Sequence, residues 1–167
     1  MLPTPLSDNL TLRPVTDADG PAIAALIAAC FAEYEGCLYE PVEFPELIHP
    51  ARHYQSKKAE LWVATDGMAL VGTVAVTPVP EQQACEITKV YLAAPYRGSG
   101  AGLMLMAHAS QRADALGYTS LVFWTDTRFH RAHRFYEKLG FARQPVQRYL
   151  ADVSLSWEHR YERHGQA

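Results

Sequence analysis

The stretch that decides the fold is PYRGSGAGLMLMAHA, residues 95–109. Glycines alternate at positions 98, 100 and 102 behind Arg97, and an apolar run with helical spacing follows. Glycine lets a backbone approach a ligand closely. A glycine-rich turn ahead of a helix also aims several amides and the positive end of the helix dipole at one point. The stretch therefore predicts a strand-to-helix loop that holds a phosphate group.

Spacing excludes two common phosphate-binding loops. A P-loop needs G-x-x-x-x-G-K-[ST], but position 103 is leucine and no lysine follows it. The dinucleotide fingerprint G-x-G-x-x-G needs glycine at 103 or 105, and both positions are leucine. What remains is R-x-x-G-x-G, formed by Arg97, Gly100 and Gly102. A glycine-rich turn that holds no ligand is the alternative interpretation.

Periodicity outlines one α/β domain over residues 1–167. Apolar alternation between turn residues predicts strands, and apolar spacing of three and four predicts helices. The expected elements are a strand at 9–15, a helix at 16–34 capped by Asp17 or Asp19, a loop at 36–46, a short helix near 45–59 broken at Pro50, a hairpin at 59–79 around Asp66-Gly67, a strand at 84–94, a helix from the glycine loop to Gly117, a strand at 119–126, a helix at 130–140 and one or two strands at 143–161. The strand meander in the middle predicts a mixed sheet.

Composition narrows the class of protein. The 167 residues carry a formal net charge of −3, which disfavours a general nucleic-acid binder. Cys30, Cys37 and Cys85 lack metal or redox spacing and are expected to be free thiols. His130 and His133 share a predicted helix face but have no third ligand nearby, so no metal site is expected. We find no signal-peptide pattern and no membrane-length apolar run, and we expect a cytoplasmic protein.

Three stretches, in order, resemble motifs of the GNAT superfamily of acyl-CoA-dependent N-acetyltransferases. They are NLTLRPVTDADGPAIAALI at 9–27, EITKVYLAAPYRGSGAGLMLM at 86–106 and RAHRFYEKLGF at 131–141. The resemblance implies a single GNAT-like α/β domain, with a central mixed sheet of about six to seven strands flanked by about four helices. It also implies acetyl-CoA as cosubstrate without a metal, and direct transfer of the acetyl group to a primary amine of a small molecule or peptide.

The resemblance leaves some questions open. Neither a nucleic acid nor a membrane is an expected partner, and a homodimer is open because the family often dimerises. A non-catalytic acyl-CoA-binding module, used for sensing or interaction, is the alternative function. A nucleotide-binding domain is a third reading, which rests on the glycine loop alone.

The resemblance also implies how the coenzyme is held. The strand at 84–94 should bulge and splay from the strand at 119–126, which frees main-chain groups for the thioester and pantetheine. The third stretch, at 131–141, is the family's closing motif. Two residues before it, at Phe129, many members have asparagine; Thr127, Arg128 or Arg131 are candidate substitutes here. The expected coenzyme-binding residues are Val90, Tyr91, Leu92, Arg97, Gly98, Ser99, Gly100, Ala101, Gly102, Leu103 and Arg131.

The resemblance places two catalytic candidates, Glu86 and Tyr136. Glu86 would accept a proton from the amine, directly or through water, and Tyr136 would donate one to the departing thiolate. Strand alternation predicts Glu86, Thr88, Val90 and Leu92 on one face, opposite Ile87, Lys89 and Tyr91. The alternative roles are an ordinary polar contact for Glu86 and packing against Phe141 for Tyr136.

An acidic, aromatic stretch follows the first helix. Residues 31–51 hold five glutamates and no lysine or arginine, with aromatic residues interleaved. In the family this stretch commonly lines the acceptor side, where it would suit a cationic amine. A solvated acidic loop is the alternative. The expected acceptor-binding residues are Glu33, Tyr34, Tyr39 and Trp124.

Overall fold

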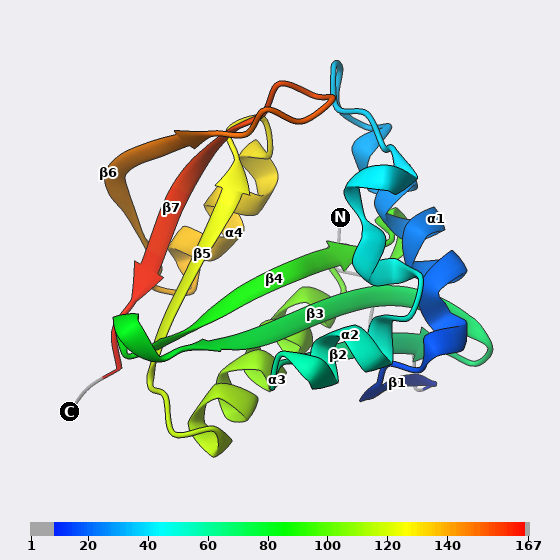
Figure 1. Cartoon of the computed structure of the whole chain (residues 1–167), viewed down its shortest axis with the longest axis horizontal. Coiled ribbons are helices and arrows are strands. Elements are labelled where there is room, and N and C mark those ends of the chain that lie inside the picture. Colours follow the sequence, from blue (N-terminus) through cyan, green and yellow to red (C-terminus); the bar gives the residue numbers. More distant parts are fainter. Residues whose placement is uncertain (1–8, 166–167) are drawn as a thin grey trace.

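The computed structural model describes residues 9–165 and confirms the expected mixed sheet. Seven strands lie in the order β1-β2-β3-β4-β5-β7-β6, and every neighbouring pair is antiparallel except β4 with β5 (Figure 1). The strands are β1 (Leu10–Pro14), β2 (Glu60–Asp66), β3 (Ala69–Val79), β4 (Ala84–Leu92), β5 (Ser120–Asp126), β6 (Ala142–Tyr149) and β7 (Trp157–Arg163). The helices are α1 (Gly20–Phe31), α2 (Pro50–Ser56), α3 (Ala101–Ala115) and α4 (His130–Lys138).

Two hydrophobic cores cover the two faces of the sheet. On one face, Ile23 and Ile27 of α1 and Tyr54 of α2 pack against β2 and β3. On the other face, Leu105 of α3 and Tyr136 of α4 pack with residues of β3, β4, β5 and β7. The sheet is therefore buried on both sides, which explains the nearly continuous apolar runs of its central strands.

The proline residues and Asp19 fix where the first two helices begin. Pro21 lies in the first turn of α1, and Pro50 begins α2 after a short 3-10 turn, so the expected break at Pro50 is the start of a helix. Asp19 directly precedes α1, but its carboxylate caps no α1 amide. It accepts hydrogen bonds from the Thr16 amide at 2.7 Å and from both Arg13 Nη atoms at 2.8 Å. It thereby joins β1 to the start of α1.

A β-bulge at Lys89 corrects the predicted side-chain alternation of β4. Thr73 pairs with Tyr91 while Ala75 pairs with Thr88, so β4 carries one extra residue between them. Lys89 has a left-handed φ of 53°, and its carbonyl accepts a 2.6 Å hydrogen bond from Thr73 Oγ1. Because the extra residue shifts the alternation, the prediction that Glu86, Thr88, Val90 and Leu92 share one face is wrong beyond the bulge.

The bulge decides which β4 residues meet each core. Val90 and Leu92 pack with Ile87 in the core beneath α3 and α4, whereas Tyr91 packs with the α1 core. Two apolar side chains predicted on the Glu86 face therefore lie on the opposite face. The strand keeps apolar contacts on both sides of the sheet after the bulge.

The parallel pair of β4 and β5 lasts only three residues. Ala84 to Glu86 pair with Ser120 to Val122, and no later pair is formed. Figure 1 shows β5 diverging from β4 toward the top of the molecule. The edge of β4 that faces β5 therefore has no ladder hydrogen bonds after Glu86, and the expected bulge and splay are both present.

The Asp19 linkage predicts acid sensitivity. The Asp19 side chain is 12% exposed, and hydrogen bonds from Arg13 lower its pKa from 3.8 to about 2. A depressed carboxyl pKa contributes stability above the unfolded value, which is lost as pH falls toward the folded value. We expect Asp19→Asn to lower the unfolding free energy by about 1–2 kcal/mol at pH 7, after allowance for the partly exposed Arg13. Urea unfolding measured between about pH 5 and pH 2 should show this difference shrinking.

Asp17→Asn is the matched control. Asp17 pairs with Arg52, whose side chain is 74% exposed, so we expect a smaller effect at neutral pH. An Asp19→Asn deficit that stays constant down to about pH 2 would contradict the linkage.

Candidate active site

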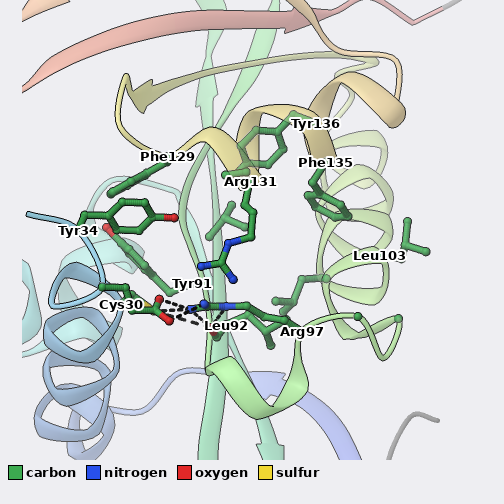
Figure 2. A pocket seen from close by; sticks show the side chains of 17 residues that line it. Cys30, Tyr34, Tyr91, Leu92, Arg97, Leu103, Phe129, Arg131, Phe135 and Tyr136 are labelled. Carbon is green, nitrogen blue, oxygen red and sulfur yellow. Dashed lines mark hydrogen bonds and ion pairs between the residues drawn. The ribbon is translucent and has the colours of Figure 1, made fainter. Parts of the chain in front are cut away.

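A first cavity of about 490 Å³ lies between α1, the end of β4, the start of α3 and α4. Figure 2 shows its lining from these four elements. Nine of the eleven residues expected to bind coenzyme lie in its wall, while Ser99 and Ala101 do not. The nine are Val90, Tyr91, Leu92, Arg97, Gly98, Gly100, Gly102, Leu103 and Arg131.

The glycine loop leaves amides free at the start of α3. Gly98 and Gly100 have φ values of 74° and 95°, which glycine adopts at little cost. The first bond of the helix runs from the Met104 amide to the Gly100 carbonyl, so the amides of Gly102 and Leu103 have no backbone acceptor. These two amides and the helix dipole form a site suited to an anion.

Gly102 has a packing role as well. A Cβ built on Gly102 would lie 3.3 Å from the ring of Phe135, which comes from α4. Glycine at this position lets α4 approach the first turn of α3 closely. The alternating glycines therefore serve two needs, backbone conformation at Gly98 and Gly100 and close helix approach at Gly102.

Arg97 is engaged with protein groups. Its guanidinium makes two 2.7 Å bonds to the Glu33 carboxylate, and its Nε and Nη2 donate to the Leu92 carbonyl at 3.2 and 3.1 Å (Figure 2). These bonds lower the pKa of Glu33. Arg97 thus connects α1 to the end of β4. Glu33, expected on the acceptor side, lies in the wall of the first cavity.

The closing motif supplies a cation and an aromatic wall. Phe129 packs against Tyr34, with ring centroids 4.8 Å apart, and both line the first cavity. Of the three substitutes suggested for asparagine, Arg131 lines this cavity and extends toward Arg97 in Figure 2. Arg128 is instead bound to Asp126 through Nε and Nη2 at 2.9 and 2.7 Å.

Tyr136 lies where two cavities meet. It lines both, its side chain packs against Phe123 and Phe141, and it is 6% exposed. Within residues 9–165 its hydroxyl has no hydrogen-bond partner. The hydroxyl oxygen is nevertheless accessible, so it opens into the cavities. Burial raises the pKa of the phenol, which keeps the proton on its oxygen at neutral pH.

A second cavity, of about 630 Å³, lies on the other side of Tyr136 and includes Glu86. Glu86 is partly buried and makes no hydrogen bond or ion pair with residues 9–165. Trp124 also lines this cavity, between the guanidinium groups of Arg148 and Arg160. Of the four expected acceptor residues, Trp124 alone lines it. Glu33 and Tyr34 line the first cavity instead, and Tyr39, which stacks on Phe44, lines neither.

Two loops bound the second cavity at its mouth. The Leu38 amide donates to Ser154 Oγ at 2.8 Å, and the Val153 amide donates to the Glu43 carboxylate at 2.7 Å. Figure 1 shows the β6–β7 loop reaching the loop after α1. Sequence reasoning missed the contribution of residues 149–158, because their apolar and polar residues alternate and fall within the predicted C-terminal strands. They add Tyr149, Leu150, Ala151, Asp152, Ser156 and Glu158 to the lining.

The remaining expectations concern metals, thiols and membranes. His133 bonds the Asp126 carbonyl at 2.8 Å, and residues 9–165 contain no group of three potential ligands that could hold a metal ion. Cys30, Cys37 and Cys85 are free thiols. Among the helices of the described chain, none has the length and apolar character needed to cross a membrane.

Known proteins resemble this chain in sequence. The Acetyltransferase (GNAT) family profile matches residues 25–141. An uncharacterised N-acetyltransferase of Schizosaccharomyces pombe is 36% identical over 98 residues, which span 58% of this chain and 60% of that relative. The uncharacterised N-acetyltransferase YjgM of Escherichia coli is 30% identical over 135 residues, which span 78% of this chain and 80% of YjgM.

Solved structures share the fold. An acetyltransferase from Streptococcus agalactiae superposes with a TM-score of 0.78 at 20% identity, covering 95% of this chain and 99% of that one. The PaiA N-acetyltransferase of Thermoplasma acidophilum, crystallised with coenzyme A, superposes with a TM-score of 0.71 at 14% identity, covering 94% and 99%. Together with the family profile and the match to YjgM, this fold establishes that the chain belongs to the GNAT acetyltransferase family.

Proposed function

We propose that the protein transfers the acetyl group of acetyl-CoA to a primary amine of a small molecule or peptide by direct attack. The observation that carries this proposal is the position of Tyr136, whose unpartnered hydroxyl lies between two cavities at the point where β4 and β5 diverge. One cavity would hold the coenzyme and the other the amine. A protein that only bound the coenzyme would not need the second cavity.

The first cavity fits coenzyme A. The free amides of Gly102 and Leu103 at the start of α3 suit a pyrophosphate, and Arg131 adds a positive charge. The unpaired edge of β4 after Glu86 offers main-chain groups to the pantetheine amides, as an added strand would use them. Bound there, acetyl-CoA supplies an acetyl thioester and a thiol leaving group.

The backbone near Leu92 is proposed to stabilise the oxyanion. Arg97 and the Cys30 thiol both approach the Leu92 carbonyl, at 3.1 and 3.7 Å, which holds this end of β4 in place. A fixed amide donor acts on developing charge without reorganising during the reaction. Arg97 is therefore a positioning residue in this proposal, through its bonds to Glu33 and Leu92.

Glu86 and Tyr136 divide the proton transfers. An alkyl amine with a pKa near 10.4 is mostly protonated, and freeing it at pH 7 costs roughly 4–5 kcal/mol. Glu86, which no cation neutralises, is available to accept that proton directly or through water. Tyr136 keeps its own proton because burial raises its pKa, so it can protonate the departing thiolate.

The direct test of the proposed function is thiol release. Purified protein with acetyl-CoA and a panel of amines should release coenzyme A in an amine-dependent way, with the acetylated amine identified by mass spectrometry. Saturable acetyl-CoA binding without thiol release on any amine would favour the sensing module instead.

Gly100→Glu tests the phosphate cradle. Gly100 has a φ of 95°, so any side chain is strained there by about 1–2 kcal/mol, and glutamate also brings a negative charge to the anion site. We expect coenzyme A binding, measured by calorimetry, to be abolished. Gly100→Ala shares the strain without the charge and should bind more tightly than Gly100→Glu. Equal coenzyme affinity in Gly100→Glu and the natural protein would remove the phosphate role from the loop.

Tyr136→Phe tests the proton donor. The substitution removes one hydroxyl and keeps the ring packed against Phe123 and Phe141. We expect kcat to fall by about a hundredfold, with the dissociation constant of acetyl-CoA nearly unchanged. Steady-state kinetics and calorimetry on the same preparation measure the two quantities. An unchanged kcat would assign Tyr136 to packing alone.

A further inference from the structure

The second cavity has more negative than positive charge facing it. Its two cations are matched by carboxylates: Lys89 Nζ lies 2.7 Å from Glu46 Oε1, and Arg148 Nε lies 2.7 Å from Glu158 Oε1. Asp126 is matched by Arg128 at 2.7 Å. Three further lining carboxylates have no cationic partner among residues 9–165, namely Glu43, Glu86 and Asp152.

Two of the three unmatched carboxylates are held in place by backbone amides. One Glu43 oxygen accepts from the Val153 amide at 2.7 Å, and Asp152 Oδ1 accepts from the Ser156 amide at 2.8 Å. These bonds orient the two side chains at the loop contact, and neither side chain forms an ion pair with a cation of residues 9–165. Glu43 is exposed and Asp152 is half-buried, so solvent screens an ion pair with a ligand less at Asp152 than at Glu43.

Two aromatic rings of this cavity already face the protein's own cations. Trp124 has Arg148 at 4.5 Å and Arg160 at 5.3 Å from its ring centroid, and Lys89 lies 5.4 Å from that of Phe44. Cation–π binding of a ligand to these two rings would compete with these contacts. The unmatched carboxylates therefore supply the charge that favours a positive ligand, and the lining cations offer no unmatched charge to an anionic group.

A separate observation also indicates a ligand here. The Tyr136 side chain is nine-tenths buried, yet its hydroxyl is accessible from this cavity and has no partner within residues 9–165. A ligand in the cavity can therefore accept or donate a hydrogen bond at this oxygen. The Leu38–Ser154 and Val153–Glu43 bonds meanwhile join the two loops at the cavity mouth, which favours a small ligand over the surface of a folded protein.

We infer that the acceptor is a small amine with two positively charged ends. Its reacting nitrogen lies between Glu86 and Tyr136, and its distant ammonium group lies at Asp152 and Glu43. This inference rests on the proposed function and narrows it to one substrate class. Glu86 accepts one proton from the ammonium group, and the neutral nitrogen bonds to the acetyl carbon as the carbon–sulfur bond breaks. The thiolate receives the Tyr136 proton, and the second proton lost by the nitrogen restores the Tyr136 hydroxyl.

Three acceptors that share a four-carbon chain test the inference with the full chain and acetyl-CoA: 1,4-diaminobutane, n-butylamine and 4-aminobutanoate. Their distant ends are positive, neutral and negative, respectively. We expect kcat/KM to fall in that order, with the diamine favoured over butylamine by about tenfold. Asp152→Asn keeps the acceptor for the Ser156 amide and should raise KM for the diamine about tenfold, while KM for butylamine changes little.

Glu81→Gln is the matched control, because Glu81 is an exposed carboxylate outside both cavities and should leave all three acceptors unaffected. Equal or better turnover of butylamine or aminobutanoate would overturn the inference and leave the proposed function intact. So would a loss in Asp152→Asn that is equal for diamine and butylamine. Failure of the diamine to react also overturns it, and the wider amine panel then decides the proposed function separately.

Discussion

The short parallel ladder between β4 and β5 is the constraint on which the site depends. After three residue pairs the strands diverge, and the bulge at Lys89, closed by the Thr73 hydroxyl, turns Tyr91 toward one core and Val90 and Leu92 toward the other. A fully paired sheet would use these main-chain groups internally. Divergence leaves them facing a cavity, and Tyr136 of α4 reaches the gap from the far side.

Charge is arranged differently in the two cavities. The coenzyme side has free helix amides and Arg131, while Arg97 is neutralised by Glu33 and braces the end of β4. The acceptor side has more carboxylates than cations, and Glu86 lines the same cavity as the shared Tyr136. An anionic cofactor and a cationic amine would thus be drawn to opposite sides of one reaction centre.

Local patterns predicted most of the fold, because periodicity, prolines and glycines act over a few residues. The glycine loop, the hairpin at Asp66-Gly67 and the helix ending before Gly140 are examples. The bulge at Lys89 reversed an alternation that looked regular, since its cause is a hydrogen bond from another strand. Glu33 was expected beside the acceptor because it belongs to the acidic stretch after the first helix. Its pairing with Arg97, 64 residues away in the chain, leaves no local pattern. The loop at Asp152 lay within a stretch predicted as strand, and it becomes part of the site through contacts with the loop after α1 that no local pattern shows.

The central claim is that main-chain groups of the diverging strand and of the glycine loop hold the coenzyme. An amide-resolved NMR titration of the protein with coenzyme A tests it most directly. The account predicts that the largest shift changes fall on the amides of residues 90–92 and 100–103, with saturation at a common dissociation constant. Changes confined to other segments, with these amides unmoved at saturation, would contradict it.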